Sequence, residues 1–192
     1  MVRVAEVTLK GISPLTQSKH YEVPRIGRES HADYEKRTWR LRMHADENGE
    51  VFIPPMALKK ALEGAASFLG KKVPGRGQKT YASFFKSTVL VMKPVSLGIS
   101  VEEVPGEELF VPCDGKPGGG SRVTKTFGRI NSWSGTAEFY VADETISKET
   151  FEEHLKIAGQ FIGLGMFRPE RGGFFGRFSV ERIKWSEMDS WR

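Results

Sequence analysis

Two stretches of helical periodicity, each set between stretches that alternate like β-strands, constrain the fold of this chain more than any other feature. Apolar and polar residues alternate over residues 2–12 and 135–141, as expected for strands with one buried face. Two further stretches have strand-like composition, and Pro94 in the first of them suggests an edge or a bulge. The four expected strands cover residues 2–12, 88–99, 135–141 and 173–185.

The two expected helices have recognisable ends. From Met56 to Leu69 the apolar residues recur near one helical face, directly after prolines that can begin a helix, and Gly70 is a fitting stop. The second helix follows Thr145 or Ser147, either of which can serve as its N-cap. The sequence therefore predicts helices on the C-terminal side of the first and third expected strands.

In chain order these elements read β-α-β-β-α-β, which predicts an α+β fold of the ferredoxin-like or RRM-like type, an antiparallel sheet with two helices on one face. The length predicts a single domain over residues 1–192, with insertions at about 13–50 and 100–133. The second insertion has a PGGGS centre, Pro117–Ser121, that is expected to be mobile in the free protein. The open face of such a sheet is a common platform for single-stranded nucleic acid.

Charge is segregated along the chain. There are 29 Lys and Arg residues against 24 Asp and Glu residues. The basic residues cluster within 19–44, 71–79 and 116–129, whereas the acidic residues concentrate elsewhere. Such segregation predicts a positive face that binds the phosphate backbone of RNA or single-stranded DNA, with an affinity that falls as salt rises.

The first insertion contains the alternating segment RTWRLRM. If it is a strand, Arg40 and Arg42 share one face and Arg37 and Trp39 share the other. Arginine interleaved with an aromatic ring suits a single strand, whose phosphates bind Arg and whose bases stack on the ring. The alternative is a hairpin whose Trp packs on the core and whose arginines are solvated.

Several function classes are excluded or disfavoured. No run of about 18 apolar residues exists, so no membrane span is expected, and the N-terminus lacks the apolar block of a secretory signal, which favours the cytoplasm. One cysteine, Cys113, leaves neither an intrachain disulfide nor a zinc site of several thiolates. The chain has no Walker sequence, no His-x-x-x-His helix and no nucleophile elbow, so neither a cofactor nor a metal is expected.

Three segments carry a family resemblance: Leu9–Leu15 (LKGISPL), Phe52–Lys59 (FIPPMALK) and Gly163–Arg177 (GLGMFRPERGGFFGR). Together they resemble the RAMP superfamily of CRISPR-associated proteins, particularly the subunits that form the backbone of effector complexes. Those proteins have a Gly-x-Ser-Pro-Leu-like turn after a strand, an Ile-Pro-Gly-Ser-Ser-Leu-Lys-Gly-like helix start and a glycine-rich turn before the last strand. Pro55 and Met56 stand here where Gly and Ser are usual, as expected for a divergent relative such as one carried by a phage.

The resemblance implies RNA binding, with the helix start along the bound guide RNA. Glycines in the turn let a phosphate or base approach the backbone, or else they only allow the chain to turn. Phe174 and Phe175 are candidates for stacking on bases, although the core is the favoured place for at least one of them. The candidate nucleic-acid-binding residues are Arg37, Trp39, Arg40, Arg42, Lys59, Lys60, Lys71, Lys72, Arg76, Arg122, Lys125, Arg168, Arg171, Gly172, Gly173, Phe174 and Arg177.

The leading hypothesis is a non-catalytic module that binds RNA or single-stranded DNA without sequence preference and assembles with copies of itself or with CRISPR effector subunits. The first alternative is a RAMP-type endoribonuclease. Some family members cut RNA with an Asp in the first insertion and others use a His as general base, which makes Asp33, His31 and His20 weak candidates, with Glu35 and His44 in the same insertion. The second alternative is a phage protein that acts on a CRISPR effector by mimicry.

Overall fold

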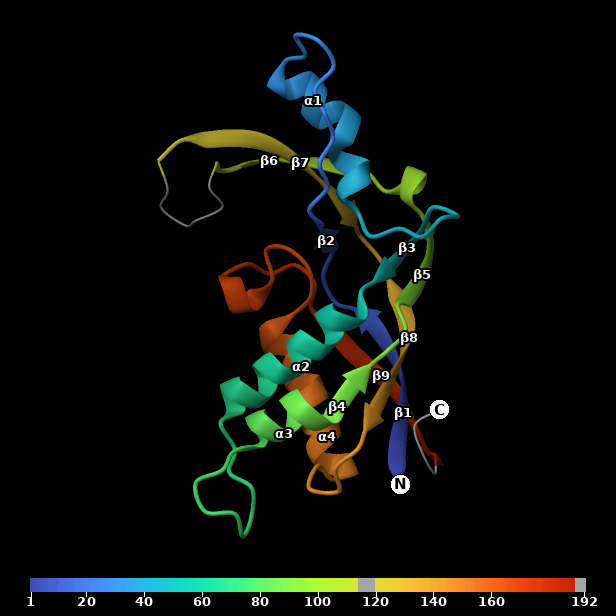
Figure 1. Cartoon of the computed structure of the whole chain (residues 1–192), viewed down its shortest axis with the longest axis vertical. Coiled ribbons are helices and arrows are strands. Elements are labelled where there is room, and N and C mark those ends of the chain that lie inside the picture. The colour runs from blue at the N-terminus through green and yellow to red at the C-terminus, as the bar shows by residue number, and fades with distance from the viewer. Residues whose placement is uncertain (114–119, 189–192) are drawn as a thin grey trace.

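A four-stranded antiparallel sheet runs through the lower half of the molecule in the computed structural model, which describes residues 1–113 and 120–188 (Figure 1). Its strands follow the order β4 (Val89–Val91), β8 (Ser134–Val141), β1 (Val2–Gly11) and β9 (Phe178–Met188). The two long central pairings, of β1 with β8 and with β9, are both antiparallel. The predicted α+β class with antiparallel strands is confirmed.

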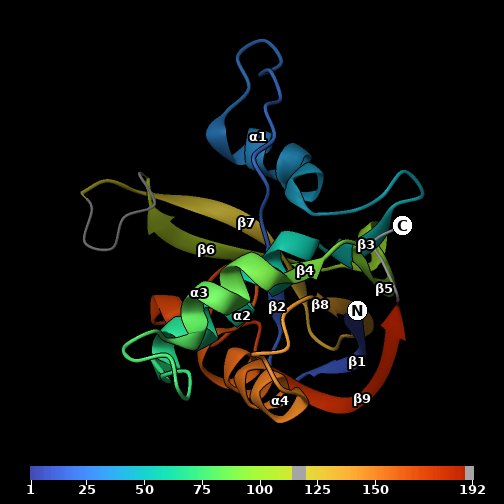
Figure 2. The same ribbon diagram turned by 60° about the horizontal axis from the view of Figure 1, so that its bottom comes forward.

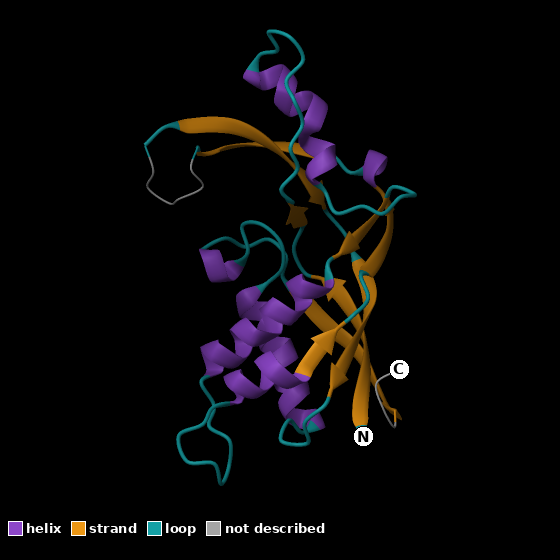
Figure 3. Ribbon diagram, in the orientation of Figure 1, coloured by secondary structure: helices purple, strands orange, loops and turns teal. Residues whose placement is uncertain are grey.

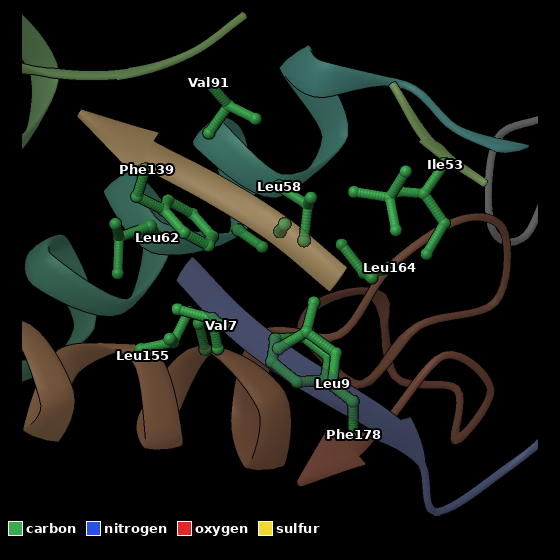
Figure 4. Packing of buried hydrophobic residues seen from close by; sticks show 14 of the residues in the cluster. Val7, Leu9, Ile53, Leu58, Leu62, Val91, Phe139, Leu155, Leu164 and Phe178 are labelled. Atoms are coloured by element: carbon green, nitrogen blue, oxygen red, sulfur yellow. The ribbon is translucent and has the colours of Figure 1, made fainter. Parts of the chain in front are cut away.

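Helices cover one face of this sheet (Figure 3). They are α2 (Pro55–Leu69), α3 (Tyr81–Thr88) and α4 (Lys148–Ile157), which continues into the π-helical turn η3 (Ala158–Ile162). Figure 4 shows the core between the layers, where buried side chains of the sheet meet those of the helices. These residues include Val7, Leu9, Phe139 and Phe178 from the sheet and Leu58, Leu62 and Leu155 from the helices. In the described part of the chain, no helix combines the length and apolar character needed to cross a membrane.

The helix ends lie where their local chemistry predicts. Pro54 is the extended N-cap of α2, Pro55 is its first helical residue, and Gly70 ends the helix with a φ of 57° in the left-handed region. Ser147 caps α4 by accepting a hydrogen bond from the backbone N–H of Thr150. Of the two predicted caps, Ser147 is therefore the one used.

Residues 15–53 and 95–130 supply most of the upper half of the molecule (Figures 1 and 2). A second sheet has the order β2, β7, β6, and a two-stranded ribbon pairs β3 with β5. The helix α1 and the 3₁₀ turn η1 pack beside β7. The bounds are β2 (Leu15–Gln17), α1 (His31–Thr38), η1 (Trp39–Arg42), β3 (Glu50–Ile53), β5 (Val95–Ser100), η2 (Val101–Glu103), β6 (Gly106–Pro112), β7 (Arg122–Ile130) and η4 (Pro169–Arg171).

Four expectations are wrong in detail. The segment RTWRLRM is helical in α1 and η1, not a strand. Residues 88–99 form two strands in different sheets, because Pro94 interrupts the run between β4 and β5. Residues 100–134, whose composition predicts an irregular stretch with strand-like pieces such as 109–112, contain the long β6–β7 hairpin. The last strand begins at Phe178, after the glycine-rich turn. Of the PGGGS segment, Pro117–Gly119 lie outside the described residues.

The ring of His154 is fully buried between α4 and α3, stacked on Phe85 at a centroid distance of 4.5 Å. Its Nδ1 lies 2.7 Å from the carbonyl oxygen of Thr150 and donates to it, because a carbonyl can only accept. Burial lowers the pKa of His154, and this outweighs the opposing effect of the Thr150 hydrogen bond.

We expect the stability of the protein to fall as the pH drops below about 6.5, the usual pKa of an unfolded histidine, because the unfolded state then binds the proton that buried His154 does not. The free energy of unfolding should fall by at most about 1.4 kcal/mol per pH unit from this one residue. Urea unfolding of the wild type and His154→Phe at pH 7.5 and 5.5 measures it. In the variant, the free energy of unfolding should change much less between pH 7.5 and 5.5. A part of the change should remain, because the pKa of half-buried His44 is also lowered. An equal pH dependence in both proteins would contradict this assignment.

Candidate nucleic-acid interface

A groove of about 600 Å³ lies between α2, which lines it from Met56 to Ser67, and residues 162–171 at the start of the glycine-rich segment. Three cationic side chains line it, namely Lys60 from α2 with Arg168 and Arg171 from the segment around η4. The carboxylates of Glu63 and Glu170 line it as well. Two parts of the chain about 100 residues apart, both carrying the family resemblance, therefore form the two walls of one groove.

The remaining segment of the resemblance, Leu9–Leu15, holds the glycine-rich wall in place. Ser13 Oγ donates to the carbonyl of Phe174 at 2.7 Å and accepts from the backbone N–H of Arg177 at 3.0 Å. The N–H of Gly176 donates to the carbonyl of Pro14. The N–H of Met166 donates to the carbonyl of Thr16, and the hydroxyl of Thr16 donates to the carbonyl of Met166. The Ser-Pro-Leu turn after β1 is thus the support on which the groove wall is built.

The glycines of this wall fall into two kinds. A Cβ on Gly176, whose φ is 71°, would lie 1.9 Å from the carbonyl oxygen of Leu164, and a Cβ on Gly173 would lie 1.8 Å from that of Phe167. These two glycines are required by backbone packing. Gly172, with a φ of 78°, has open space around the Cβ position.

Most backbone amides at the end of the turn are already used. The N–H groups of Gly172 and Gly173 donate to the carbonyls of Pro169 and Arg168, and those of Phe175 and Gly176 donate to Phe167 and Pro14. The turn therefore presents side chains to the groove, not a cradle of free N–H groups. Phe175 is buried and Phe174 is exposed, so the core takes one of the two phenylalanines.

Adjacent lysines at the start of α2 have different environments. Lys59 Nζ donates to the carbonyls of Lys86 and Val89 at 2.8 and 2.7 Å, and its side chain is only 13% exposed. It ties α2 to the junction of α3 and β4. Lys60 is 60% exposed and lies 2.7 Å from Glu63. Burial would raise the pKa of Glu63, but the two lysines outweigh it and lower that pKa, so Glu63 is a carboxylate.

The two groove arginines differ in the same way. Arg168 donates through Nε and Nη2 to Glu170 Oε2 at 2.9 and 2.7 Å, and through Nη1 to the carbonyl of Gly165. The exposed guanidinium of Arg171 makes no hydrogen bond or ion pair with any residue that the structure describes. Arg171 is thus the groove cation most available to an anion.

A second hollow, of about 520 Å³, lies between α1 and the β6–β7 hairpin, and we call it the α1 hollow. Arg25, His31, Arg42 and Lys125 contribute its basic side chains. It is lined by Val23, Arg25, His31, Tyr34, Glu35, Arg42, Cys113, Val123 and Lys125. It brings residues of both insertions together.

A buried ion pair joins α1 to the hairpin at this hollow. Arg42 donates to both carboxylate oxygens of Glu35, at 2.8 and 2.5 Å, and also to the carbonyl of Thr126. Glu35 in turn accepts from the backbone N–H of Thr126. Burial raises the pKa of Glu35, but these hydrogen bonds and the charge of Arg42 outweigh it, so that the pKa lies below its usual value. Arg42 therefore serves the fold as well as lining the hollow.

We expect Glu35→Ala to lower the free energy of unfolding by about 3 kcal/mol, because it leaves the largely buried Arg42 without its counter-ion. Lys36→Ala, one residue along the same helix and exposed, is the matched control and should change stability by less than about 0.5 kcal/mol. Urea denaturation measures both. Equal effects of the two substitutions would show that the pair does not hold α1 to β7.

The other candidates of the first insertion lie apart from the groove. Trp39 is 7% exposed, in the core against Gly106, and Arg40 stacks on its ring at 4.2 Å. The predicted strand with a base-stacking Trp39 is wrong, because the helical turn points the ring inward. Arg37 pairs with Glu29 at 2.7 Å and lowers the pKa of that carboxyl to about 2.

The catalytic candidates Asp33, His31 and His20 are not brought together with the groove. His31 Nε2 lies 3.1 Å from the carbonyl of Thr124 in the α1 hollow. Asp33 accepts from Ser30 at the start of α1, and exposed His20 lies 3.6 Å from Glu22. His44, in contrast, lines the groove.

The remaining basic candidates are spread over the surface. The loop between α2 and α3 carries Lys71, which pairs with Glu153, together with Lys72 and Arg76. This loop lies at the opposite end of the molecule from α1 (Figure 1). Arg122 stacks over exposed Phe110 on the hairpin at 5.9 Å, and Arg177 is exposed just before β9.

The sheet face away from the helices carries paired charges. Glu6 and Glu138 lie opposite each other on β1 and β8, and each is within ion-pair distance of a lysine, Lys184 or Lys93. Tyr140 on this face is buried and donates to Glu138. This face therefore lacks the exposed rings of a base-stacking platform among the described residues, and the groove is the stronger candidate.

Sequence reasoning did not identify the groove carboxylates Glu63 and Glu170. The spacing of Glu63, three and four residues after Lys60 and Lys59 on an expected helix, was the available signal, because such positions are neighbours on a helix surface. No comparable signal marks Glu170, because its pairing with Arg168 depends on the conformation of the turn.

Comparison with known proteins gives structural relatives only. No family model matches the chain, and no curated protein matches it. A chain in the cryo-EM structure of the type III-B Cmr-beta bound to cognate target RNA is similar over 96% of this chain and 60% of its own length, with 13% identity and a TM-score of 0.57. Cmr6 from Pyrococcus furiosus is similar over 94% of this chain and 99% of its own, with 15% identity and a TM-score of 0.50.

This chain thus spans about 60% of the length of the Cmr-beta chain that it resembles. At such identities the likeness establishes the fold. The chain therefore has a fold similar to those of the type III-B Cmr-beta chain and of Cmr6.

Proposed function

We propose that this chain, whose fold is that of the type III-B Cmr proteins, is a non-catalytic module that binds single-stranded RNA by its phosphate backbone without sequence preference. The observation that carries the proposal is the groove in which Lys60 faces Arg168 and Arg171. We also propose that β1, α2, β4, β8, α4 and β9 are the β-α-β-β-α-β core, with α3 as an addition before β4.

The cations of the groove can exchange their present carboxylate partners for the phosphates of a bound anion. Arg171 is free to contact a phosphate at once. Lys60, which is 60% exposed, can leave Glu63 because Lys59 still lies 3.3 Å from that carboxylate. The pair of Arg168 with Glu170 is partly exposed, and ion pairs near the surface contribute only about 0–1 kcal/mol. Bidentate arginine contacts suit phosphate oxygens. Release of counter-ions from the RNA then supplies much of the affinity.

We propose that the α1 hollow extends the path of the strand, because Arg25, Arg42 and Lys125 line it and Arg122 lies on the hairpin beside it. Because Arg42 is held by Glu35, we expect Arg25 and Lys125 to make the phosphate contacts in this hollow.

Fluorescence anisotropy of labelled single-stranded RNA across a series of KCl concentrations tests the proposal. Three phosphate contacts in the groove predict a slope of log K against log salt of about −2, and contacts in the α1 hollow make it steeper. Homopolymers of different base composition should bind similarly. No binding at low salt, or an affinity independent of salt, would contradict the proposal, and stronger binding to DNA of the same length would reassign the ligand.

Assembly is the second part of the proposal. We propose that copies of this chain, or CRISPR effector subunits, lie side by side along the bound strand. Native mass spectrometry with RNAs of increasing length measures this as a stepwise increase in copy number. Association with an effector protein that survives nuclease treatment, without RNA binding, would favour the alternative of a protein that mimics an effector subunit.

One observation favours RNA cleavage as a second candidate function. His44 lines the groove, and burial followed by the charge of Lys19 lowers its pKa, so its imidazole is neutral near pH 7. A neutral imidazole beside bound RNA can accept the proton of a 2′-hydroxyl. End-labelled RNA incubated in EDTA should stay intact under the binding proposal. Cleavage that His44→Ala abolishes and His20→Ala leaves unchanged would establish the second candidate instead.

A further inference from the structure

Two phenylalanine rings lie stacked on each other at the surface, at the end of the groove. Phe68 is 63% exposed and Phe161 is 48% exposed. Their centroids are 5.6 Å apart and their planes differ by 15°. Large exposed apolar groups that pack on each other outside the core mark a site of interaction more often than single exposed residues do.

The pair continues the groove along α2. Phe68 lies one helical turn after Gly64, which lines the groove, and two turns, about 12 Å, after Lys60. Phe161 directly precedes Ile162, which lines the groove and whose side chain would lie 3.1 Å from a Cβ on Gly64. The rings therefore border the end of the groove that is farthest from Pro54.

The backbone places both rings outward. Phe161 belongs to the π-helical turn η3, and such turns occur frequently at functional sites. Its neighbours Ala158 and Ile162 are buried, so the turn is anchored in the core while Phe161 faces solvent beside Phe68. Lys72 follows Phe68 by four residues, so a cation lies on each side of Phe68 along the chain, Lys60 before it and Lys72 after it.

We propose that the Phe68–Phe161 pair stacks a base of the single-stranded RNA whose backbone the groove binds. The proposal rests on the proposed function and deepens it, because it assigns a binding site to the bases. A nucleobase fits better than an apolar protein segment, since the rings present flat surfaces next to a groove of phosphate-binding cations. Every base has a π-face, so such a site is compatible with binding that ignores sequence.

The test compares RNA with an abasic oligonucleotide of the same length, which has the same phosphates and no bases. The wild type should bind the RNA at least about fivefold more tightly than the abasic strand. The double variant Phe68→Leu/Phe161→Leu should lose this preference, keep its affinity for the abasic strand and keep its salt slope. Met92→Ala, an exposed apolar side chain just after β4, is the control and should behave like the wild type.

The outcomes separate the two proposals. A variant that keeps the preference of the wild type overturns the stacking site and leaves the proposed function standing. A wild type that binds neither strand overturns both. A variant that keeps the preference but loses self-association, measured by analytical ultracentrifugation, would assign the pair to a protein interface. Quenching of 2-aminopurine in the RNA by the wild type, and its loss in the double variant, is the independent expected readout.

Discussion

Replacing Lys60 and Arg171 by glutamate is expected to reduce the affinity for single-stranded RNA roughly 100-fold at low salt, which corresponds to about 1.5 kcal/mol for each charge-assisted contact. The substitutions also add two carboxylates to a groove that already holds Glu63 and Glu170. The salt slope should become shallower by about 1.4, because two phosphate contacts on a single strand are lost. Fluorescence anisotropy at several KCl concentrations measures both quantities.

The matched control is Lys36→Glu/Lys86→Glu, which changes the net charge of the protein by the same amount. Both lysines are exposed, and neither lines the groove or the α1 hollow. This variant should lose less than about threefold in affinity, because neither side chain lines the groove or the α1 hollow and salt screens exposed charges that do not contact the RNA. Equal losses in the two double variants would mean that the overall charge of the protein, and not the groove, binds the RNA.

Replacing Gly176 by alanine is expected to destabilise the protein by about 3 kcal/mol or more. The left-handed conformation alone costs an ordinary residue about 1–2 kcal/mol. The new Cβ would also lie 1.9 Å from the carbonyl oxygen of Leu164, so the backbone at the base of the groove wall has to move. Urea or thermal unfolding measures the loss, and RNA affinity should fall with it because Arg168 and Arg171 are carried by this wall.

Gly172→Ala is the comparison that isolates the steric effect. Gly172 shares the positive φ, at 78°, but has nothing near its Cβ position. It should therefore lose only about 1–2 kcal/mol. Equal losses at the two positions would show that backbone conformation alone sets the requirement for glycine, and that the close contact with Leu164 has relaxed.

Local signals predicted the elements of the lower half well. The alternation over residues 2–12 and 135–141 corresponds to β1 and β8, and the prolines, Gly70 and Ser147 mark the ends of α2 and α4. These features act within one strand or one helical turn, so the residues that cause them are neighbours in sequence. The antiparallel α+β class was predictable because it follows from the order of these locally determined elements.

The segment RTWRLRM shows where such reasoning fails. Its spacing of Arg and Trp imitates the alternation of a strand, but Arg42 bonds to Glu35 and to Thr126 on β7, and Trp39 packs against Gly106. These partners come from α1 and from the second insertion, 7 to 84 residues away. Tertiary contacts therefore decided that the segment is helical and that its tryptophan is buried.

The candidate site, too, was determined partly by the sequence and partly by the tertiary structure. The sequence alone determined the positions of the helix caps, the strand alternation, the clustering of positive charge and the three segments of the family resemblance, because each depends on residues close together in the chain. Only the tertiary structure decided which cations face a ligand. Lys59 and Lys71 are engaged by distant partners, whereas Lys60, Arg168 and Arg171 meet in one groove. Availability for binding depends on ion pairs and hydrogen bonds between distant segments, and those exist only once the chain has folded.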